Sequence, residues 1–179
     1  MKKSGVFDEE RHLYLRKGHS ETFQHILIKT LAYIYFWEDS REIKIEPNYR
    51  FKGYKPDLLK LIPSDIPRRL KKEVGLWVEC KDVNIKKLQK LARSLPNSRI
   101  YWFNLTSYFR ILLNDKKILQ KIKQYDNLHL IGIALQKSDY NFLARDLGRK
   151  NIEWGIEKNE NTLSIYTKHW NKTIEFQRW

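Results

Sequence analysis

The segment that decides the fold reads VGLWVECK and spans residues 74–81. It is the most apolar of the β-like runs, and it ends in two charged residues, Glu79 and Lys81. Because side chains two positions apart on a strand point to the same face, we expect Glu79 and Lys81 to project together. Val78 and Cys80 should face the other way, with Cys80 as a small core residue. Burying an unpaired charge is costly, so two charges at the end of a buried strand indicate a site.

Periodic patterns on both sides of this segment predict alternating helices and strands. Before it, we expect a strand over 11–16, a helix over 21–37 with Ser20 as its N-cap, strands over 43–45 and 54–61, and a loop over 62–72. After it, we expect helices over 85–95, 105–124 and 138–147, and strands over 100–103, 128–135, 153–156, 163–166 and 173–176. The helix over 105–124 should break around Asn114-Asp115, where Asp115 can cap the second piece. The pattern predicts a single α/β domain over residues 1–179, with a mixed central sheet flanked by helices and further β elements near the C-terminus.

The composition bounds the class of protein. A chain of 179 residues fits one domain, and a hydrophobic fraction of 41% is enough for a packed core. A single cysteine excludes a disulfide framework and a multi-cysteine metal site, and it suits a reducing compartment. No apolar run is long enough to span a membrane, and the first residues lack the apolar stretch of a signal peptide. We therefore expect a cytoplasmic protein with no membrane partner.

The charge of the chain indicates what it binds. Lys and Arg number 35 against 21 Asp and Glu, which leaves a net charge of +14 and an isoelectric point near 9.8. The excess is concentrated in residues 66–95, which hold nine basic side chains and three acidic ones. A domain this basic favours an anionic partner, most commonly nucleic acid. The alternative is a lysine-rich surface that serves only solubility.

Asp57 adds a second carboxylate to the candidate site, because it follows Pro56 in the strand-like segment that precedes the apolar one. Two carboxylates with a lysine beside them suit Mg²⁺ or Mn²⁺, which hold a water molecule and a phosphate oxygen side by side. Lys81 would then orient or deprotonate the water, or neutralise charge that develops on phosphorus. If Pro56-Asp57 or Glu79-x-Lys81 is considered alone, a surface ion pair is the simpler interpretation.

These residues resemble the PD-(D/E)XK motif of a superfamily of metal-dependent nucleases, whose core has the restriction-endonuclease-like order αβββαβ. The resemblance implies that Asp57 and Glu79 bind the metal, that Lys81 positions the nucleophile, and that Glu21 at the start of the first helix is a third acid. The alternative role for Glu21 is to stabilise the helix through its dipole. Polar residues on the helix after the motif often contact the DNA backbone in this superfamily, which implicates Lys86, Gln89 and Lys90.

A closer resemblance is to the YaeQ family, a bacterial branch of that superfamily, and it covers most of the chain from about residue 10. It rests on Ser20-Glu21-Thr22, Pro56-Asp57-Leu58, Leu76-Trp77-Val78-Glu79, the spaced Lys86 and Lys90, Tyr125-Asp126-Asn127-Leu128, and Arg178-Trp179. The extra first strand of that family is missing or short here. Many members lack the lysine of Glu-x-Lys, whereas this chain keeps Lys81, which favours catalytic competence.

The sequence therefore predicts a Mg²⁺- or Mn²⁺-dependent nuclease that hydrolyses phosphodiester bonds, with DNA favoured over RNA as the substrate. The alternatives are a nucleic-acid-binding accessory protein that kept the fold but does not cut, and a protein-interaction scaffold. The residues expected to contact phosphates are Arg68, Arg69, Lys71, Lys72, Lys86, Gln89, Lys90 and Arg93.

Overall fold

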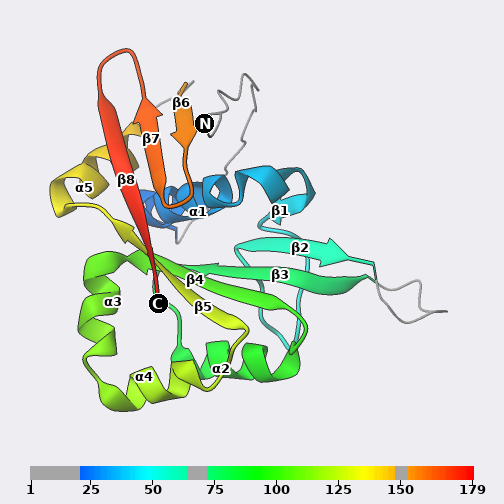
Figure 1. Ribbon diagram of the computed structural model, residues 1–179. Coiled ribbons are helices and arrows are strands. Elements are labelled where there is room, and N and C mark those ends of the chain that lie inside the picture. Colours follow the sequence, from blue (N-terminus) through cyan, green and yellow to red (C-terminus); the bar gives the residue numbers. More distant parts are fainter. Residues whose placement is uncertain (1–20, 64–71, 148–152) are drawn as a thin grey trace, which may run out of the picture.

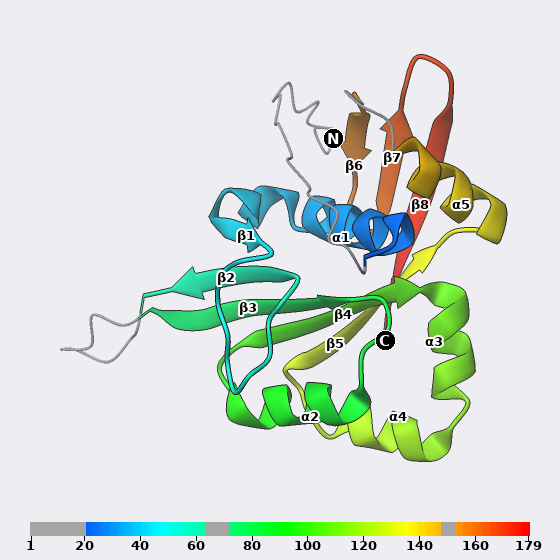
Figure 2. The ribbon, with the colours of Figure 1, turned by 180° about the vertical axis from the view of Figure 1, so that it is seen from behind.

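The computed structural model describes residues 21–63, 72–147 and 153–179 (Figures 1 and 2). The helices are α1 (Phe23–Tyr35), the short 3-10 helix η1 (Trp37–Glu42), α2 (Ile85–Ser94), α3 (Thr106–Leu113), α4 (Lys116–Lys123) and α5 (Lys137–Asp146). The strands are β1 (Ile43–Ile45), β2 (Leu58–Ile62), β3 (Glu73–Cys80), β4 (Arg99–Leu105), β5 (Leu128–Ala134), β6 (Gly155–Lys158), β7 (Thr162–Tyr166) and β8 (Asn171–Arg178). The predicted mixed α/β architecture is confirmed.

The described strands form one sheet in the order β1-β2-β3-β4-β5-β8-β7-β6. β3, β4 and β5 run parallel, and the other neighbouring strands pair antiparallel. The parallel strands are connected through helices, as parallel pairing requires. Beyond β5 the sheet curls, so that β8, β7 and β6 rise beside α1 and α5 (Figure 1).

Helices cover both faces of the sheet and divide the interior into two cores. On one side, α1 and α5 pack against Val78, Cys80 and Phe103 and against the inner face of β7 and β8. On the other side lie α2, α3 and α4 (Figure 2), which pack against Trp77 and Trp102. Residues 76–80 of β3 are therefore buried on both faces, which explains why this segment lacks the alternation of a half-exposed strand.

Several boundaries differ from those expected, and two of the differences have a clear local cause. α1 begins at Phe23 with Thr22 as its N-cap, because the Thr22 hydroxyl accepts a hydrogen bond from the backbone N–H of His25 at 3.2 Å. β2 begins at Leu58 rather than Tyr54, since Pro56 lacks the N–H that a strand interior needs. The expected strand over 11–16, Ser20 and residues 64–71 of the expected loop lie outside the described residues.

No helix in the described ranges combines the length and the apolar character needed to cross a bilayer.

Candidate functional site

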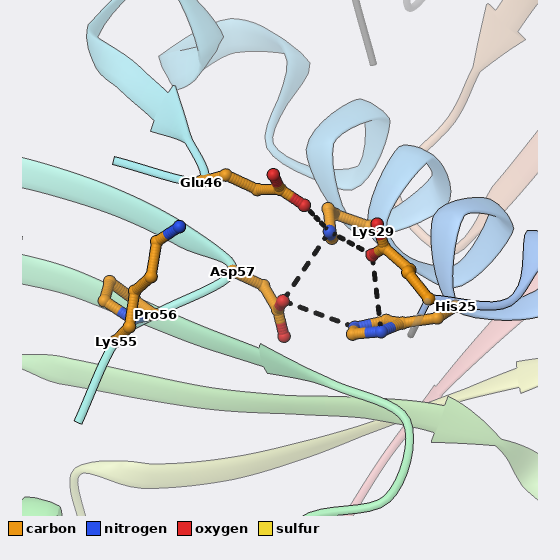
Figure 3. Close-up of a pocket in the computed structure, with 7 residues that line it drawn as sticks. His25, Lys29, Glu46, Lys55, Pro56 and Asp57 are labelled. Atoms are coloured by element: carbon orange, nitrogen blue, oxygen red, sulfur yellow. Dashed lines mark hydrogen bonds and ion pairs between the residues drawn. The ribbon is translucent and has the colours of Figure 1, made fainter. Parts of the chain in front are cut away.

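The candidate site is a pocket of about 280 Å³ between the start of α1 and the chain that leads from β1 into β2. α1 supplies His25 and Lys29 (Figure 3). Glu21, which also lines the pocket, lies just before this helix. The opposite wall is formed by Glu46, Lys55, Pro56 and Asp57. The pocket thus includes Glu21 and Asp57, two of the residues that the sequence predicts for the site.

Lys29 lies at the centre of the pocket. Its Nζ atom is 2.5 Å from Oε1 of Glu21 and 3.8 Å from Oδ1 of Asp57, and it is also bonded to Glu46. The side chain is only 2% exposed. Burial acts to lower the pKa of Lys29, but hydrogen bonds to Glu21 and Glu46 and the nearby charge of Asp57 outweigh it, so the pKa is raised above its usual value. Lys29 therefore carries a full positive charge at neutral pH.

His25 lies between the same two carboxylates. Its Nδ1 is 3.4 Å from Oε1 of Glu21, and its Nε2 is 3.3 Å from Oδ1 of Asp57 (Figure 3). Because His25 and Lys29 are one turn apart on α1, both side chains point to the same side of the helix. α1 thus places two nitrogen groups against a shared pair of acids.

Asp57 also contacts the backbone of the central strand. Its Oδ2 accepts a hydrogen bond from the N–H of Cys80 at 2.8 Å. Cys80 itself is buried in the core on the α1 side, as expected, and burial raises the pKa of its thiol. Asp57 is therefore held against Cys80, the residue between Glu79 and Lys81.

Glu79 points to the α2 side of the sheet. Its Oε1 accepts a hydrogen bond from Trp77 Nε1 at 2.7 Å and lies 2.6 Å from Lys87 Nζ on α2. Burial raises the pKa of Glu79, while the charge and hydrogen bond of Lys87 and the hydrogen bond of Trp77 act in the opposite direction. The negative charge of Asp57 adds to the increase.

Lys81 does not share a strand face with Glu79, which corrects the expectation from strand alternation. β3 ends at Cys80, and Lys81 adopts a φ of +65°, so the chain turns there and the alternation stops. The Lys81 Nζ donates a hydrogen bond to the Thr22 hydroxyl at 3.3 Å, at the N-terminus of α1. The Lys81 carbonyl oxygen accepts from Trp102 Nε1 at 2.6 Å and from Asn104 Nδ2 at 3.2 Å, which holds the turn in place.

The acids predicted as metal ligands are each bound to a lysine. Glu21 and Asp57 converge on Lys29, whereas Glu79 binds Lys87 on the other side of the sheet. Within the described ranges, no three His, Cys, Asp or Glu side chains are arranged to hold a metal ion. The observed arrangement of Asp57, Glu79 and Glu21 therefore does not fit a shared divalent ion.

The residues predicted to contact phosphates fall into two groups. Arg68, Arg69 and Lys71 lie outside the described residues, and Lys72 is exposed beside them in sequence. On α2, Lys86, Lys90 and Arg93 are exposed and Gln89 is half-buried. Lys90 Nζ lies 5.3 Å from the centre of the Tyr54 ring, and Arg93 bonds the Tyr125 hydroxyl at 3.1 Å.

Sequence reasoning missed two features. Lys29 is the one charged residue within 26–37, and a lone charge inside an apolar helix is a signal for a buried ion pair. The second is α4, whose four lysines (Lys116, Lys117, Lys121 and Lys123) are all exposed. A basic helix was visible in the sequence, but its position beside α2 was not. No sequence pattern marks Glu46 as a partner of Lys29.

Solved structures of other proteins have a fold similar to this one. No protein-family model matches the chain, and no curated protein matches it either. The architecture is that of a mixed α/β domain with helices on both faces of a curled sheet, and it is shared with two solved YaeQ proteins. One is YaeQ from Xanthomonas axonopodis pv. citri, with a TM-score of 0.65 and 15% identity over 93% of this chain and 85% of that chain. The other is YaeQ from Pseudomonas syringae, with a TM-score of 0.61 and 16% identity over 90% of this chain and 80% of that chain.

Proposed function

We propose that this protein is a YaeQ-like nucleic-acid-binding protein that contacts DNA through the α2–α4 surface, defined as the exposed side of helices α2 and α4. The observation that carries the proposal is the charge of these two helices. Each has four basic residues and no acidic one, and the helices contact each other. They also lie along the same side of the sheet (Figure 1). An acid-free cationic surface of this kind suits a polyanion with regularly spaced charges.

The aromatic residues beside the α2–α4 surface strengthen this interpretation. Lys87 and Lys90 both lie over the Tyr54 ring, with Nζ 5.5 Å and 5.3 Å from its centre. Lys52 bonds the Ser94 hydroxyl at the end of α2 at 2.7 Å, which adds another ammonium to the same region. Rings held next to cations can stack on bases while the cations contact phosphates.

The salt dependence of DNA binding tests the proposal. Each phosphate contact adds about −0.9 to the slope of log affinity against log salt for duplex DNA. The double substitution of Lys117 and Lys121 by glutamine on α4 should flatten that slope by about 1 to 2 units, and the same change at Lys86 and Lys90 on α2 should do likewise. Fluorescence anisotropy with a short labelled duplex at several salt concentrations measures it.

The matched control changes Lys137 and Lys168 to glutamine. Both are exposed, and neither belongs to the α2–α4 surface, since Lys137 begins α5 and Lys168 lies between β7 and β8. This variant has the same net charge as the other two. If all three double variants lower the slope equally, binding follows overall charge and the α2–α4 surface is not the binding site. If the wild type does not bind DNA or RNA in a salt-dependent way, the proposal fails and the scaffold alternative is favoured.

Hydrolysis of phosphodiester bonds is the second candidate function, with Asp57, Glu79, Glu21 and Lys81 as the catalytic set of a PD-(D/E)XK nuclease and Mg²⁺ or Mn²⁺ as cofactor. The observation in its favour is that Asp57 binds the Cys80 N–H and Lys81 reaches Thr22, next to Glu21. Three of the four motif residues thus meet near the N-terminus of α1. The pairing of each acid with a lysine favours the non-cleaving alternative.

Cleavage assays separate the two functions. Branched, nicked, single-stranded and duplex DNA, and RNA, are incubated with the wild type and Lys81→Met in Mg²⁺ or Mn²⁺. A nuclease should lose on the order of 10²–10⁴ in rate in Lys81→Met, because a positioned acid–base group contributes about that much. Cleavage by the wild type that persists within a few-fold in Lys81→Met would remove Lys81 from the mechanism. Binding without cleavage supports the accessory role.

A further inference from the structure

Three carboxylates surround one buried ammonium in the pocket of Figure 3. Glu21 precedes α1, Glu46 follows β1 and Asp57 precedes β2, so three separate segments of the chain meet at Lys29. An ammonium has three donor hydrogens and no acceptor, and it can therefore serve several oxygens at once. The arrangement of acids around Lys29 resembles the way oxygen ligands surround a hard cation.

The cluster needs a positive charge to be stable. Carboxylates brought close together repel each other, and burial adds to the cost of keeping them ionised. His25 lies against Glu21 and Asp57 but is farther from both than Lys29 is from Glu21, with separations of 3.4 and 3.3 Å against 2.5 Å. Lys29 is thus the central cation of the cluster.

Lys29 is also fixed in this position. It lies on α1 between Ile28 and Thr30, both buried, and its own side chain is 2% exposed. Lys55 lines the same pocket but is exposed. The two lysines therefore differ in what they can do, because Lys55 can move away in solvent whereas Lys29 is held against the acids.

From this geometry we propose that the ammonium of Lys29 is the resident cation of the Glu21–Glu46–Asp57 cluster and takes the place that a divalent metal ion would otherwise occupy. Lys29 is a positioning residue, which holds three segments of the chain together at the start of α1. In the wild type the ammonium then occupies the position among the carboxylates that a divalent ion would need. Around Lys29 the three carboxylates are not arranged to hold a metal ion, so removal of the ammonium, with the stem of the side chain kept, should let them move in on a divalent cation as hard oxygen ligands.

Mn²⁺ binding tests this inference. Free Mn²⁺ is measured by electron paramagnetic resonance, and thermal unfolding is followed with and without Mn²⁺, for the wild type, Lys29→Met and Lys55→Met. Lys29→Met should bind one Mn²⁺ at least tenfold more tightly than the wild type. Its melting temperature should be low without metal and rise on addition of Mn²⁺, because a ligand that binds only the native state stabilises it. Lys55→Met, which removes the same charge from the same pocket, should behave as the wild type.

Two results would overturn the inference. The first is stoichiometric Mn²⁺ binding by the wild type that is lost in Asp57→Asn, which would show that a metal occupies the cluster with Lys29 present. This measurement decides the matter even if Lys29→Met fails to fold with or without Mn²⁺. The second is a folded Lys29→Met that binds Mn²⁺ no better than Lys55→Met.

The inference about Lys29 and the proposed DNA binding are tested by different measurements, so either can be wrong while the other holds. DNA binding by the α2–α4 surface is measured without metal and does not depend on Lys29. The inference does conflict with metal-dependent hydrolysis at Asp57 and Glu21, so the wild-type Mn²⁺ measurement bears on both.

Discussion

The carboxylate of Asp57 accepts a hydrogen bond from the backbone N–H of Cys80, with 2.8 Å between Asp57 Oδ2 and Cys80 N. This bond connects the loop before β2 to the end of β3, next to the main-chain bond from Asp57 N–H to the Val78 carbonyl at 3.0 Å. It brings the two halves of the candidate motif together although 23 residues separate them.

Substitutions at Asp57 should separate the effect of this hydrogen bond from the effect of charge. Asp57→Asn keeps an oxygen that can accept from Cys80 N–H, whereas Asp57→Ala leaves that N–H without the acceptor in a residue that is 3% exposed. We expect Asp57→Ala to be less stable than Asp57→Asn by about 1–3 kcal/mol in urea denaturation. Equal stability of the two variants would mean that the hydrogen bond contributes little.

The Glu79–Lys87 pair should show strong coupling, because Glu79 is almost fully buried. Lys87→Met leaves the Glu79 carboxylate without its ammonium partner, while the double variant with Glu79→Gln removes both charges and keeps an acceptor for Trp77. We expect Lys87→Met alone to lose about 1–3 kcal/mol, and the double variant to recover part of that loss. The neighbouring exposed Lys86→Met is the control and should change stability by less than about 0.5 kcal/mol. A double variant that is simply additive would contradict the coupling.

The stability of the protein should fall below neutral pH, in part through His129. Burial lowers the pKa of His129 from the usual 6.5, and the charges of Arg178 and Arg99 add to the effect. The Arg178 guanidinium can only donate, so it bonds the unprotonated Nδ1 of His129, at 3.1 Å. As pH falls through 6.5 towards the lower folded pKa, the unfolded state binds a proton that the native state resists, and stability is lost.

Urea denaturation at pH 7.5 and at lower pH measures this dependence in the wild type and in His129→Gln. The free energy of unfolding of His129→Gln should fall less at low pH than that of the wild type. His169→Gln, a change at an exposed histidine, should keep the wild-type decline. An unchanged pH dependence in His129→Gln would exclude His129 as a source of it.

Gly132 should not tolerate a side chain, because the C-terminal tryptophan packs against it. A Cβ atom at Gly132 would lie 2.4 Å from Cζ3 of Trp179 and 2.8 Å from the Thr106 hydroxyl oxygen. Gly132→Ala should therefore displace Trp179 and cost about 1–3 kcal/mol in urea denaturation. Gly155→Ala is the control, since its nearest neighbour, Cβ of Tyr166, would be at 3.5 Å. A smaller penalty for Gly132→Ala in a Trp179→Ala background would confirm the cause.

Local sequence patterns determined the secondary structure and the location of the cores. Apolar periodicity predicts α1 and α2, and the apolar run of residues 74–80 predicts a buried strand, which the structure shows as β3. These predictions succeed because the spacing of apolar residues along the chain shows which face of a helix or strand is buried. The basic character of α2 was likewise visible, because charge is a property of composition.

Only the tertiary structure decided which charges meet. Alternation along a strand placed Lys81 with Glu79, but the positive φ of Lys81 turns its ammonium to Thr22. Nothing in the order of residues shows that Lys29 binds Glu21, Glu46 and Asp57, or that Lys87 binds Glu79. These ion pairs join different elements of the fold, and the few ångströms over which an ammonium binds a carboxylate are set by the packing of α1 and α2 on the sheet.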